Sequence, residues 1–212
     1  MRDYTHIDQY LDELLSDIYS QLMDDEHYAK MKAYIEKYIR PLKIDTVLDV
    51  GCGQGEANAL FSELGVKYTG VTLGVDVEIA KCVGIQVYES DFSFLPFPDN
   101  SFDLVFSRHS VEHSPMPLLT LMEWHRVAKT WLGLVAPNPL YWTEVGRNHY
   151  SVLTKPQISW LLRRAGWVIK KFTSTETELQ FLCRKRPRMG YEGWATIPLE
   201  NEIRSWELRV TR

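Results

Sequence analysis

The stretch Val47-Leu48-Asp49-Val50-Gly51-Cys52-Gly53-Gln54-Gly55 carries the strongest structural signal of the chain. An apolar run typical of a β-strand passes into a glycine-rich turn, and the helix-forming run 56–61 follows. Because glycine lacks a Cβ, the backbone of such a turn can approach a ligand closely. The helix that follows presents unpaired N–H groups in its first turn. This succession of strand, turn and helix start predicts a site for a nucleotide-like ligand.

From Lys43 onward, short apolar runs alternate with helical patterns, which is typical of βαβ units and a mainly parallel sheet. We expect strands at 46–50, 67–72, 85–88, 102–107, 131–136, 167–173 and 178–184. We expect helices at 56–64, 77–82 and 118–129, and one that begins at Thr154 with a capping pattern and ends at Gly166. The predicted fold class is α/β, a doubly wound, mainly parallel seven-stranded sheet with helices on both faces and a C-terminal antiparallel hairpin.

The chain length of 212 residues suits one α/β domain with a small appendage. We divide it into residues 1–42, two helices that pack on the domain, the ligand-binding domain 43–186, and a C-terminal extension 187–212. The two N-terminal helices are expected at about 5–23 and 28–39, the second ending before Pro41 because proline interrupts the hydrogen-bond ladder.

Composition is that of an ordinary globular protein, with 45% hydrophobic and 25% charged residues. The chain starts with an acidic amphipathic stretch instead of an apolar run, so we expect neither a signal peptide nor a membrane span. Its three cysteines are far apart in sequence and suit reduced thiols. These features together predict a cytoplasmic protein.

Glu56 decides between two kinds of nucleotide-like ligand. It stands where the dinucleotide fingerprint Gly-x-Gly-x-x-Gly has its third glycine. A carboxylate at this helix start would repel a pyrophosphate, but it does not oppose a ligand that carries a sulfonium and an ammonium group. An NAD-linked oxidoreductase is therefore disfavoured.

The spacing Asp-x-Gly-x-Gly-x-Gly, from Asp49 to Gly55, resembles the first motif of class I S-adenosyl-L-methionine (SAM) dependent methyltransferases. Four further stretches resemble this family, and its type-11 methyltransferase domains, in the expected order: 70–73, 89–92, 95–105 and 123–139. The resemblance covers about residues 44 to 184. It implies a Rossmann-like fold and SAM as the cofactor.

The same resemblance implies a set of cofactor contacts. They are Asp49, Gly51, Cys52, Gly53, Gly55, Thr72, Leu73, Asp91, Phe92 and Ser107. Asp91 is expected to meet the adenine amino group. Many members end the second strand with an acid that accepts hydrogen bonds from the ribose, whereas Thr72 offers a weaker acceptor and Asp76 is a nearby substitute. The Thr-Leu pair also resembles two other methyltransferase branches, so the substitution does not exclude binding.

Methyl transfer from a sulfonium is an in-line displacement, so the protein aligns the nucleophile, excludes water and accepts a proton where one must leave. His109 and His113 follow the fourth expected strand at the carboxyl edge of the sheet, where doubly wound folds bind ligands. With His149 they are the candidate bases. The alternative for His113 is packing against the cofactor or anchoring of the loop.

The residues His109 to His113 also spell His-x-x-Glu-His, a zinc motif that needs both histidines on one helical face. We expect a loop here, because Pro115 and Pro117 follow closely. A similar Glu-x-x-Glu-His stretch in ubiquinone-pathway O-methyltransferases is associated with a divalent metal, but His109 replaces its first carboxylate. We therefore expect no metal.

Two segments offer candidate contacts to other molecules. In the loop 140–150, Trp142 and Tyr150 could stack on an acceptor and Arg147 could hold an anionic group, or the loop could be packed by its own aromatics. The extension 187–212 interleaves aromatic residues with arginines, which also occurs in proteins that bind single-stranded nucleic acid. We expect it to pack on the domain or on a second subunit, as in a homodimer.

The sequence thus predicts a SAM-dependent methyltransferase (EC 2.1.1 type) that methylates an oxygen, nitrogen or carbon of a small-molecule acceptor. A nucleic-acid methyltransferase is an alternative, although the Asn/Asp-Pro-Pro-Tyr/Phe motif of amino-methylating DNA enzymes is missing. The other alternative is a SAM-binding regulatory module without activity. This alternative stays open because Thr72 replaces the acid that usually binds the ribose.

Overall fold

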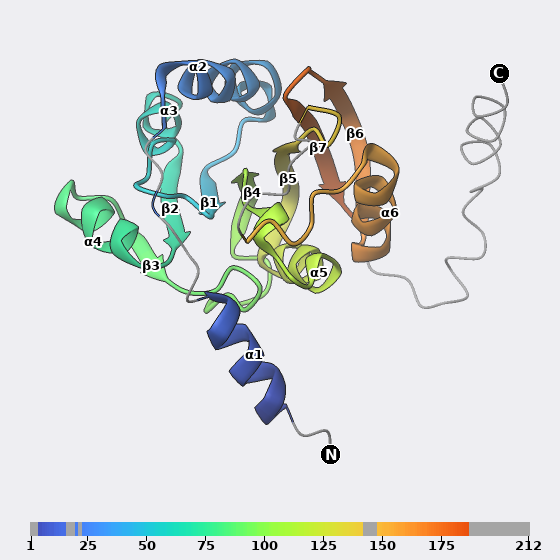
Figure 1. The fold of residues 1–212 in the computed structure, drawn as a ribbon. Helices are drawn as coiled ribbons and strands as arrows, with labels where there is room; N and C mark the ends of the chain where they lie inside the picture. Colours follow the sequence, from blue (N-terminus) through green and yellow to red (C-terminus); the bar gives the residue numbers. More distant parts are fainter. Residues whose placement is uncertain (1–3, 16–19, 21–22, 142–147, 187–212) are drawn as a thin grey trace, which may run out of the picture.

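The computed structural model describes residues 4–15, 20, 23–141 and 148–186. Seven strands form one sheet in the order β3-β2-β1-β4-β5-β7-β6 (Figure 1). They are β1 (Thr46–Val50), β2 (Lys67–Thr72), β3 (Val87–Glu89), β4 (Phe102–Arg108), β5 (Ala128–Pro137), β6 (Trp167–Ser174) and β7 (Glu178–Lys185). The first five strands run parallel, and β7 pairs antiparallel with both β5 and β6. The predicted α/β fold class is confirmed.

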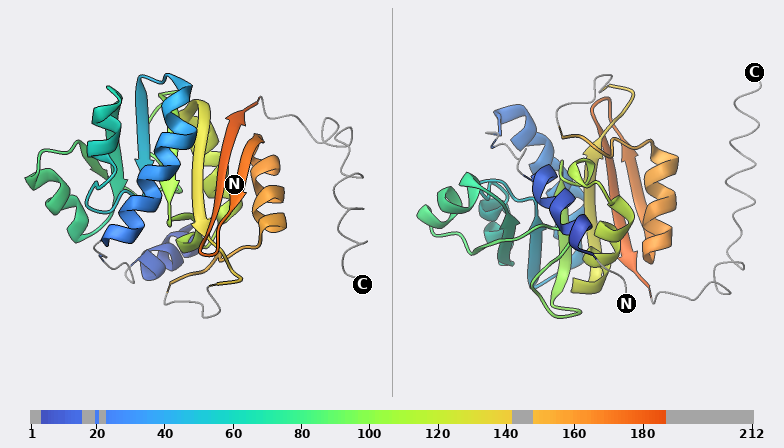
Figure 2. Two further views of the ribbon diagram at one scale, coloured as in Figure 1. Left: turned by 90° about the horizontal axis from the view of Figure 1, so that it is seen from above. Right: turned by 60° about the horizontal axis from the view of Figure 1, so that its bottom comes forward.

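Helices cover both faces of this sheet, as Figure 2 shows. They are α1 (Thr5–Leu15), α2 (Asp25–Tyr34), α3 (Asn58–Glu63), α4 (Val75–Cys82), α5 (Pro117–Val127) and α6 (Lys155–Ala165), with the short turns η1 (Ile35–Ile39), η2 (Arg40–Leu42) and η3 (Val111–His113). None of the helices in the described part of the chain combines the length and apolar character needed to cross a membrane.

Two hydrophobic clusters lie on opposite faces of the sheet because side chains of a strand alternate in direction. Val47 packs with α2, η1 and α3, whereas its neighbour Leu48 packs with α5 and α6. Leu104 and Val105 repeat this alternation on β4. By contrast, α1 projects away from the sheet in Figure 1, and none of its residues is buried.

Several element boundaries differ from the sequence prediction. The helical path continues beyond Ile39 through Pro41, which lies in the first turn of η2, where a missing N–H leaves no hydrogen bond unmade. The helix expected from residue 56 begins at Asn58 because the glycine-rich turn extends further. β5 begins at Ala128, directly after α5 and three residues before the expected start. The extension 187–212 lies outside the described residues.

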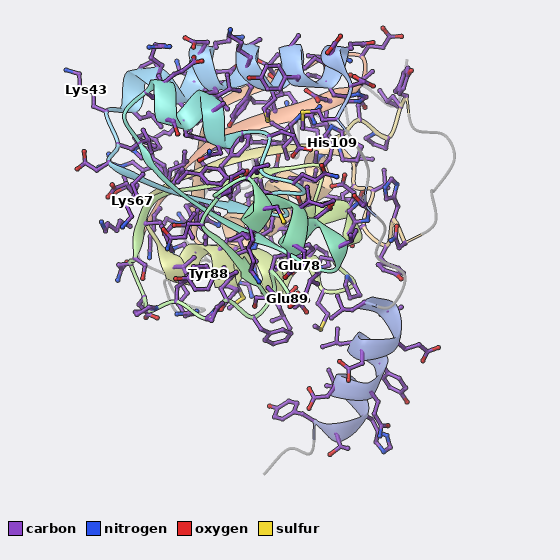
Figure 3. All side chains as sticks on the ribbon, turned by 90° about the vertical axis from the view of Figure 1, so that its left-hand side faces the viewer. Lys43, Lys67, Glu78, Tyr88, Glu89 and His109 are labelled. Carbon is purple, nitrogen blue, oxygen red and sulfur yellow. The ribbon has the colours of Figure 1, made fainter. Side chains whose placement is uncertain are left out.

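The position of β1 defines the ligand-binding edge. β1 pairs with β2 on one side and β4 on the other, so the chain reverses its direction across the sheet at this strand. In open α/β sheets ligands bind beyond the carboxyl ends of the strands at such a point. Figure 3 shows His109, which follows β4, at the opposite edge from Lys43 and Lys67, which lie at the amino ends of β1 and β2.

Candidate cofactor and acceptor site

The three glycines of the turn after β1 have left-handed backbones, with φ of 73° at Gly51, 55° at Gly53 and 89° at Gly55. A Cβ on Gly51 would lie 2.2 Å from Oγ of Ser110, and one on Gly55 would lie 2.5 Å from Cδ1 of Ile85. Packing therefore requires glycine at position 51, whereas a side chain at position 55 would force the Ile85 side chain to move. At Gly53 the nearest atom is the end of a flexible side chain, 3.3 Å away, so that only the backbone angle demands glycine.

Backbone hydrogen bonds fasten this turn to β2. The amides of Gly51 and Cys52 both donate to the carbonyl of Val71, at 2.9 and 3.0 Å. The thiol of Cys52 is buried against Gly70, where a Cβ would come within 2.6 Å of the sulfur. Gly70 is thus needed for the turn to approach β2, and the Cys52 side chain packs against that strand.

Asp49 is the buried acid of β1, one residue before the strand ends at Val50. The hydroxyl of Tyr68 donates a 2.7 Å hydrogen bond to its Oδ2. Burial raises the pKa of Asp49 to about 7, although the Tyr68 hydrogen bond acts in the opposite direction. The charge of Glu56 adds to this increase.

Two further acids share this electrostatic environment. Burial raises the pKa of Glu56, and the charge of Asp76 at the start of α4 raises it further. None of the three carboxyls forms an ion pair with a described lysine, arginine or histidine. Carboxyls that oppose one another's ionisation favour a positively charged ligand between them.

Ser20 connects the predicted ribose position at the end of β2 with the glycine-rich turn. Thr72 is the last residue of β2 and Leu73 follows it, both partly buried. Asp76 is not directed at solvent, because the hydroxyl of Ser20 donates to its Oδ1 at 2.5 Å. Gln54 of the glycine-rich turn donates to the same hydroxyl at 3.2 Å. Ser20 therefore links the turn to the start of α4.

Hydrogen bonds hold the segment after β3 in place. The amide of Ser93 donates to Oδ1 of Asp91 at 2.7 Å. The carbonyl of Phe92 accepts from the Trp124 indole at 2.9 Å, and the two rings meet edge to face. Ser107, the next predicted contact, is fully buried in β4, and its Oγ has no hydrogen-bond partner among the described residues.

A buried network of charges follows β4. Arg108 donates to Oε1 of Glu178 on β7 at 2.7 Å. His109 lies between two carboxylates, with Nε2 3.1 Å from Glu178 and Nδ1 3.4 Å from Glu112. Burial by itself would lower the pKa of His109, but its hydrogen bonds to the two carboxylates raise it above the usual value. The two carboxylates thus favour the imidazolium form of His109, which can donate a hydrogen bond to each of them.

His113 and His149 form a second group. Their rings lie edge to face with centroids 4.7 Å apart. The segment that carries His149 is fastened to η3 and to the residue after it. Nδ1 of His113 lies 3.2 Å from the Asn148 carbonyl. The amide of Ser151 donates to the Glu112 carbonyl, and the hydroxyl of Ser151 donates to the Ser114 carbonyl. Burial lowers the pKa of His149, and the charge of His113 lowers it further, so His149 is neutral near pH 7.

Not all predicted site residues are brought together. His109 precedes η3 in a left-handed conformation, φ 50°, so it shares no helical face with His113. Tyr150 is exposed beside His149. Trp142 and Arg147 lie outside the described residues.

Sequence reasoning missed Glu178 and Tyr68. A signal for Glu178 existed, since it opens a strand that is apolar at Leu179 and from Phe181 to Cys183, and a buried charge in such a strand needs a partner. No local pattern pointed from Tyr68 to Asp49.

Comparisons with known proteins find similarity to methyltransferases, both in sequence and in fold. Residues 48–130 match the family model of the methyltransferase domain. A SAM-dependent methyltransferase from Archaeoglobus fulgidus shares the fold, with a TM-score of 0.61 and 19% identity over 74% of this chain and 94% of that one. Residues 48–130 therefore resemble a methyltransferase domain, and the fold of the described residues is the Rossmann-like one of SAM-dependent methyltransferases.

Two other similarities limit what this resemblance implies. A probable methyltransferase of Aspergillus luteorubrus is 34% identical over 121 residues, which cover 46% of this chain and 40% of that protein. The chain spans less than half the length of the curated relatives it matches. The [4+2]-cyclase SpnF has the same fold, with a TM-score of 0.66 and 18% identity over 86% of this chain and 93% of that one. The fold therefore does not by itself define the reaction.

Proposed function

We propose that this protein is a methyltransferase that binds SAM at the glycine-rich turn and methylates a small-molecule acceptor. The observation that carries the proposal is the group of carboxyls formed by Asp49, Glu56 and Asp76 around that turn. SAM carries a sulfonium and an ammonium group, whose positive charge such carboxyls stabilise. The same group would repel the pyrophosphate of NAD.

The glycine-rich turn fits such a ligand because its backbone is left-handed at three positions and follows a buried acid. In this proposal the methionine part of SAM is held by Asp49, the glycines of the turn and the backbone of Cys52. Thr72, Leu73 and Asp76 hold the ribose, and Asp91, Phe92 and Ser107 hold the adenine side. When bound, SAM supplies an electrophilic methyl group.

The acceptor side is assigned to η3 and the segment 148–151. His149, neutral near pH 7, and its neighbour His113 handle the proton that leaves the acceptor. His109 holds its two carboxylates in place, and Tyr150 lies at the rim. A net charge of −4 disfavours a polyanionic acceptor, which supports a small molecule over nucleic acid.

Calorimetry with SAM and with NAD tests the cofactor. We expect binding of SAM to the full chain and no binding of NAD; the reverse result would refute the assignment. Transfer of a tritiated methyl group from SAM into a cell extract, followed by separation of small molecules, nucleic acid and protein, tests the acceptor class. Label in nucleic acid alone would overturn the small-molecule acceptor. Binding of SAM without transfer into any pool would support a regulatory module.

A further inference from the structure

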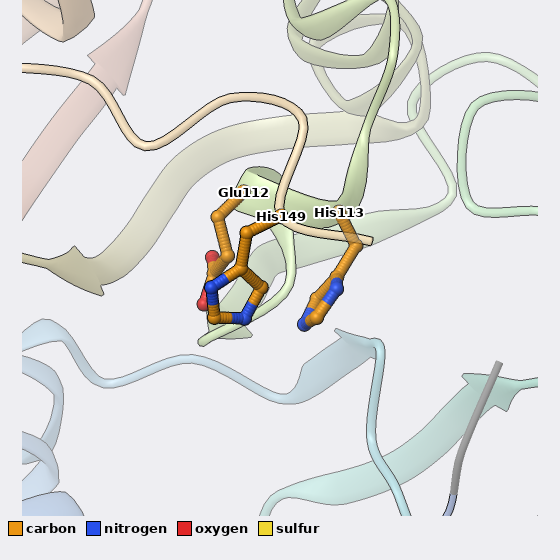
Figure 4. Close-up of side chains that lie close together, drawn as sticks. All are labelled: Glu112, His113 and His149. Carbon is orange, nitrogen blue, oxygen red and sulfur yellow. The ribbon is translucent and has the colours of Figure 1, made fainter. Parts of the chain in front are cut away.

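Three side chains that can bind metals converge beyond β4. Glu112 and His113 belong to η3, and His149 comes from the segment that precedes α6, some 36 residues later in the chain. One ligand atom from each lies within 4.8 Å of those of the other two. Figure 4 shows the three side chains directed toward one another. A tetrahedral ion with bonds of about 2.1 Å separates its ligands by roughly 3.4 Å, which small side-chain rotations would achieve here.

Two atoms of this cluster lack the hydrogen bonds that buried polar atoms normally make. Glu112 is 1% exposed, and its Oε2 has no partner among the described residues. Nδ1 of His149 is likewise buried without a described partner. Leaving a carboxylate oxygen buried without a donor is costly, so such an atom points to a bound ion or water.

The other atoms of the cluster are held in orientations suited to a metal. Oε1 of Glu112 faces the His109 ring at 3.4 Å, which leaves Oε2 for the ion. The Asn148 carbonyl can only accept a hydrogen bond, so Nδ1 of His113, 3.2 Å away, carries the proton and Nε2 carries the lone pair. Histidines that bind metals are commonly oriented in this way by a carbonyl on their second nitrogen.

We propose that Glu112, His113 and His149 bind a divalent transition-metal ion, of which Zn²⁺ is the reference. Two imidazoles and one carboxylate select such ions over Mg²⁺ and Ca²⁺, which prefer oxygen ligands. Three protein ligands leave at least one coordination position open, as in catalytic metal sites.

The site adjoins the glycine-rich turn. Ser110, the residue before η3, donates to the Val50 carbonyl at 3.1 Å and packs on Gly51. If the proposed function holds, the open position binds an oxygen of a hydroxylated acceptor and lowers the pKa of that hydroxyl. Its O–H bond then breaks and the proton passes to water. The electron pair left on the oxygen forms the new bond to the methyl group, while the S–CH3 bond of SAM breaks and its electron pair stays on the sulfur of the departing thioether. His113 and His149 then act as ligands instead of bases.

Direct titration tests the site. The full chain without an affinity tag, stripped with a chelator, is titrated with Zn²⁺ and with Mg²⁺ by calorimetry. We expect one equivalent of Zn²⁺ to bind, and affinity to fall about tenfold or more in Glu112→Gln and in His149→Ala. His6→Ala on α1, where none of the residues is buried, is the matched control and retains wild-type affinity. Co²⁺ provides a second signal, through visible absorption bands that the two site variants lose.

Thermal unfolding in chelator shows whether each variant folds. Equal Zn²⁺ affinity in folded wild type and site variants would overturn the metal site. SAM calorimetry on the same samples separates this inference from the proposed function: Zn²⁺ binding without SAM binding contradicts only the function, and SAM binding without Zn²⁺ binding contradicts only the metal site.

Discussion

The hydroxyl of Tyr68 on β2 donates a 2.7 Å hydrogen bond to Oδ2 of Asp49 on the adjacent strand β1. Burial nevertheless raises the pKa of Asp49 to about 7. The pKa of an aspartate in an unfolded chain is about 3.9. Between about pH 4 and pH 7, Asp49 is therefore protonated in the folded protein and ionised in the unfolded chain. The contribution of Asp49 to stability therefore falls as pH rises from about 4 to about 7.

Ionisation of Asp49 should control cofactor affinity. A carboxylate stabilises the positive charges of SAM, so we expect SAM to bind more tightly as pH rises from about 6 to about 8. Tyr68→Phe removes the donor to the ionised form and should move this transition to higher pH. Calorimetry across this pH range measures both effects. In Asp49→Asn the pH dependence should flatten, and a wild-type profile in that variant would show that another group titrates.

The glycines of the turn should respond differently to alanine. Gly51→Ala places its Cβ against Ser110 and should destabilise the protein by about 2 kcal/mol or more. Gly53→Ala has space and should cost only about 1 kcal/mol of backbone strain, while it weakens SAM binding. Urea unfolding and SAM calorimetry measure the two effects.

The double variant Gly51→Ala with Ser110→Gly provides the control for the predicted contact. Removal of the Ser110 side chain should recover part of the stability that Gly51→Ala loses. Additive losses in the double variant would mean that this contact is not the cause.

Glu178 should stabilise the protein at neutral pH and lose this effect in acid. Burial would raise its pKa, but His109, Arg108 and Gln180 hold it at about 2. Because the unfolded value is about 4.3, this stabilisation is complete above about pH 5 and is lost as pH falls toward 2. Glu178→Gln leaves buried Arg108 unpaired, and we expect a loss of about 3 kcal/mol at pH 7.

Urea unfolding at several pH values measures this loss. Stability of Glu178→Gln should depend less on pH between about 5 and 2 than that of wild type. Glu176→Gln, at an exposed carboxylate two residues away, is the matched control and should behave as wild type. An unchanged acid profile in Glu178→Gln would contradict the role of the network.

Ser151 should position His149. Its hydroxyl donates a buried 2.7 Å hydrogen bond to the Ser114 carbonyl, so Ser151→Ala should cost about 1 kcal/mol of stability. It should also weaken Zn²⁺ binding, because the segment that carries His149 loses one of its attachments to η3. Thermal unfolding and Zn²⁺ titration measure the two effects, and retained Zn²⁺ affinity in a destabilised Ser151→Ala would assign Ser151 to stability alone.

Sequence reasoning succeeded where local patterns dominate. The bounds of β1 and β2 agree with the prediction, because both are short stretches rich in strand-forming residues that lie between turn signals. The helix α6 begins after Thr154, whose amide donates to the Gln157 side chain, and ends at Gly166 with φ 101°, as its capping residues predict. Boundaries at Pro41 and Ala128 were missed, because sheet pairing and first-turn geometry override the local preference.

The sequence by itself determined the strands, the glycine-rich turn and the position of Glu56 beside it, because these depend on hydrophobic periodicity and on the conformational freedom of neighbouring residues. Only the tertiary structure decided that Tyr68 meets Asp49, that Glu178 holds His109 across 69 residues of chain, and that His149 lies against His113. These pairs depend on strand order and on the path of a loop. Periodicity encodes which face of an element is buried, but not which distant side chain it meets there.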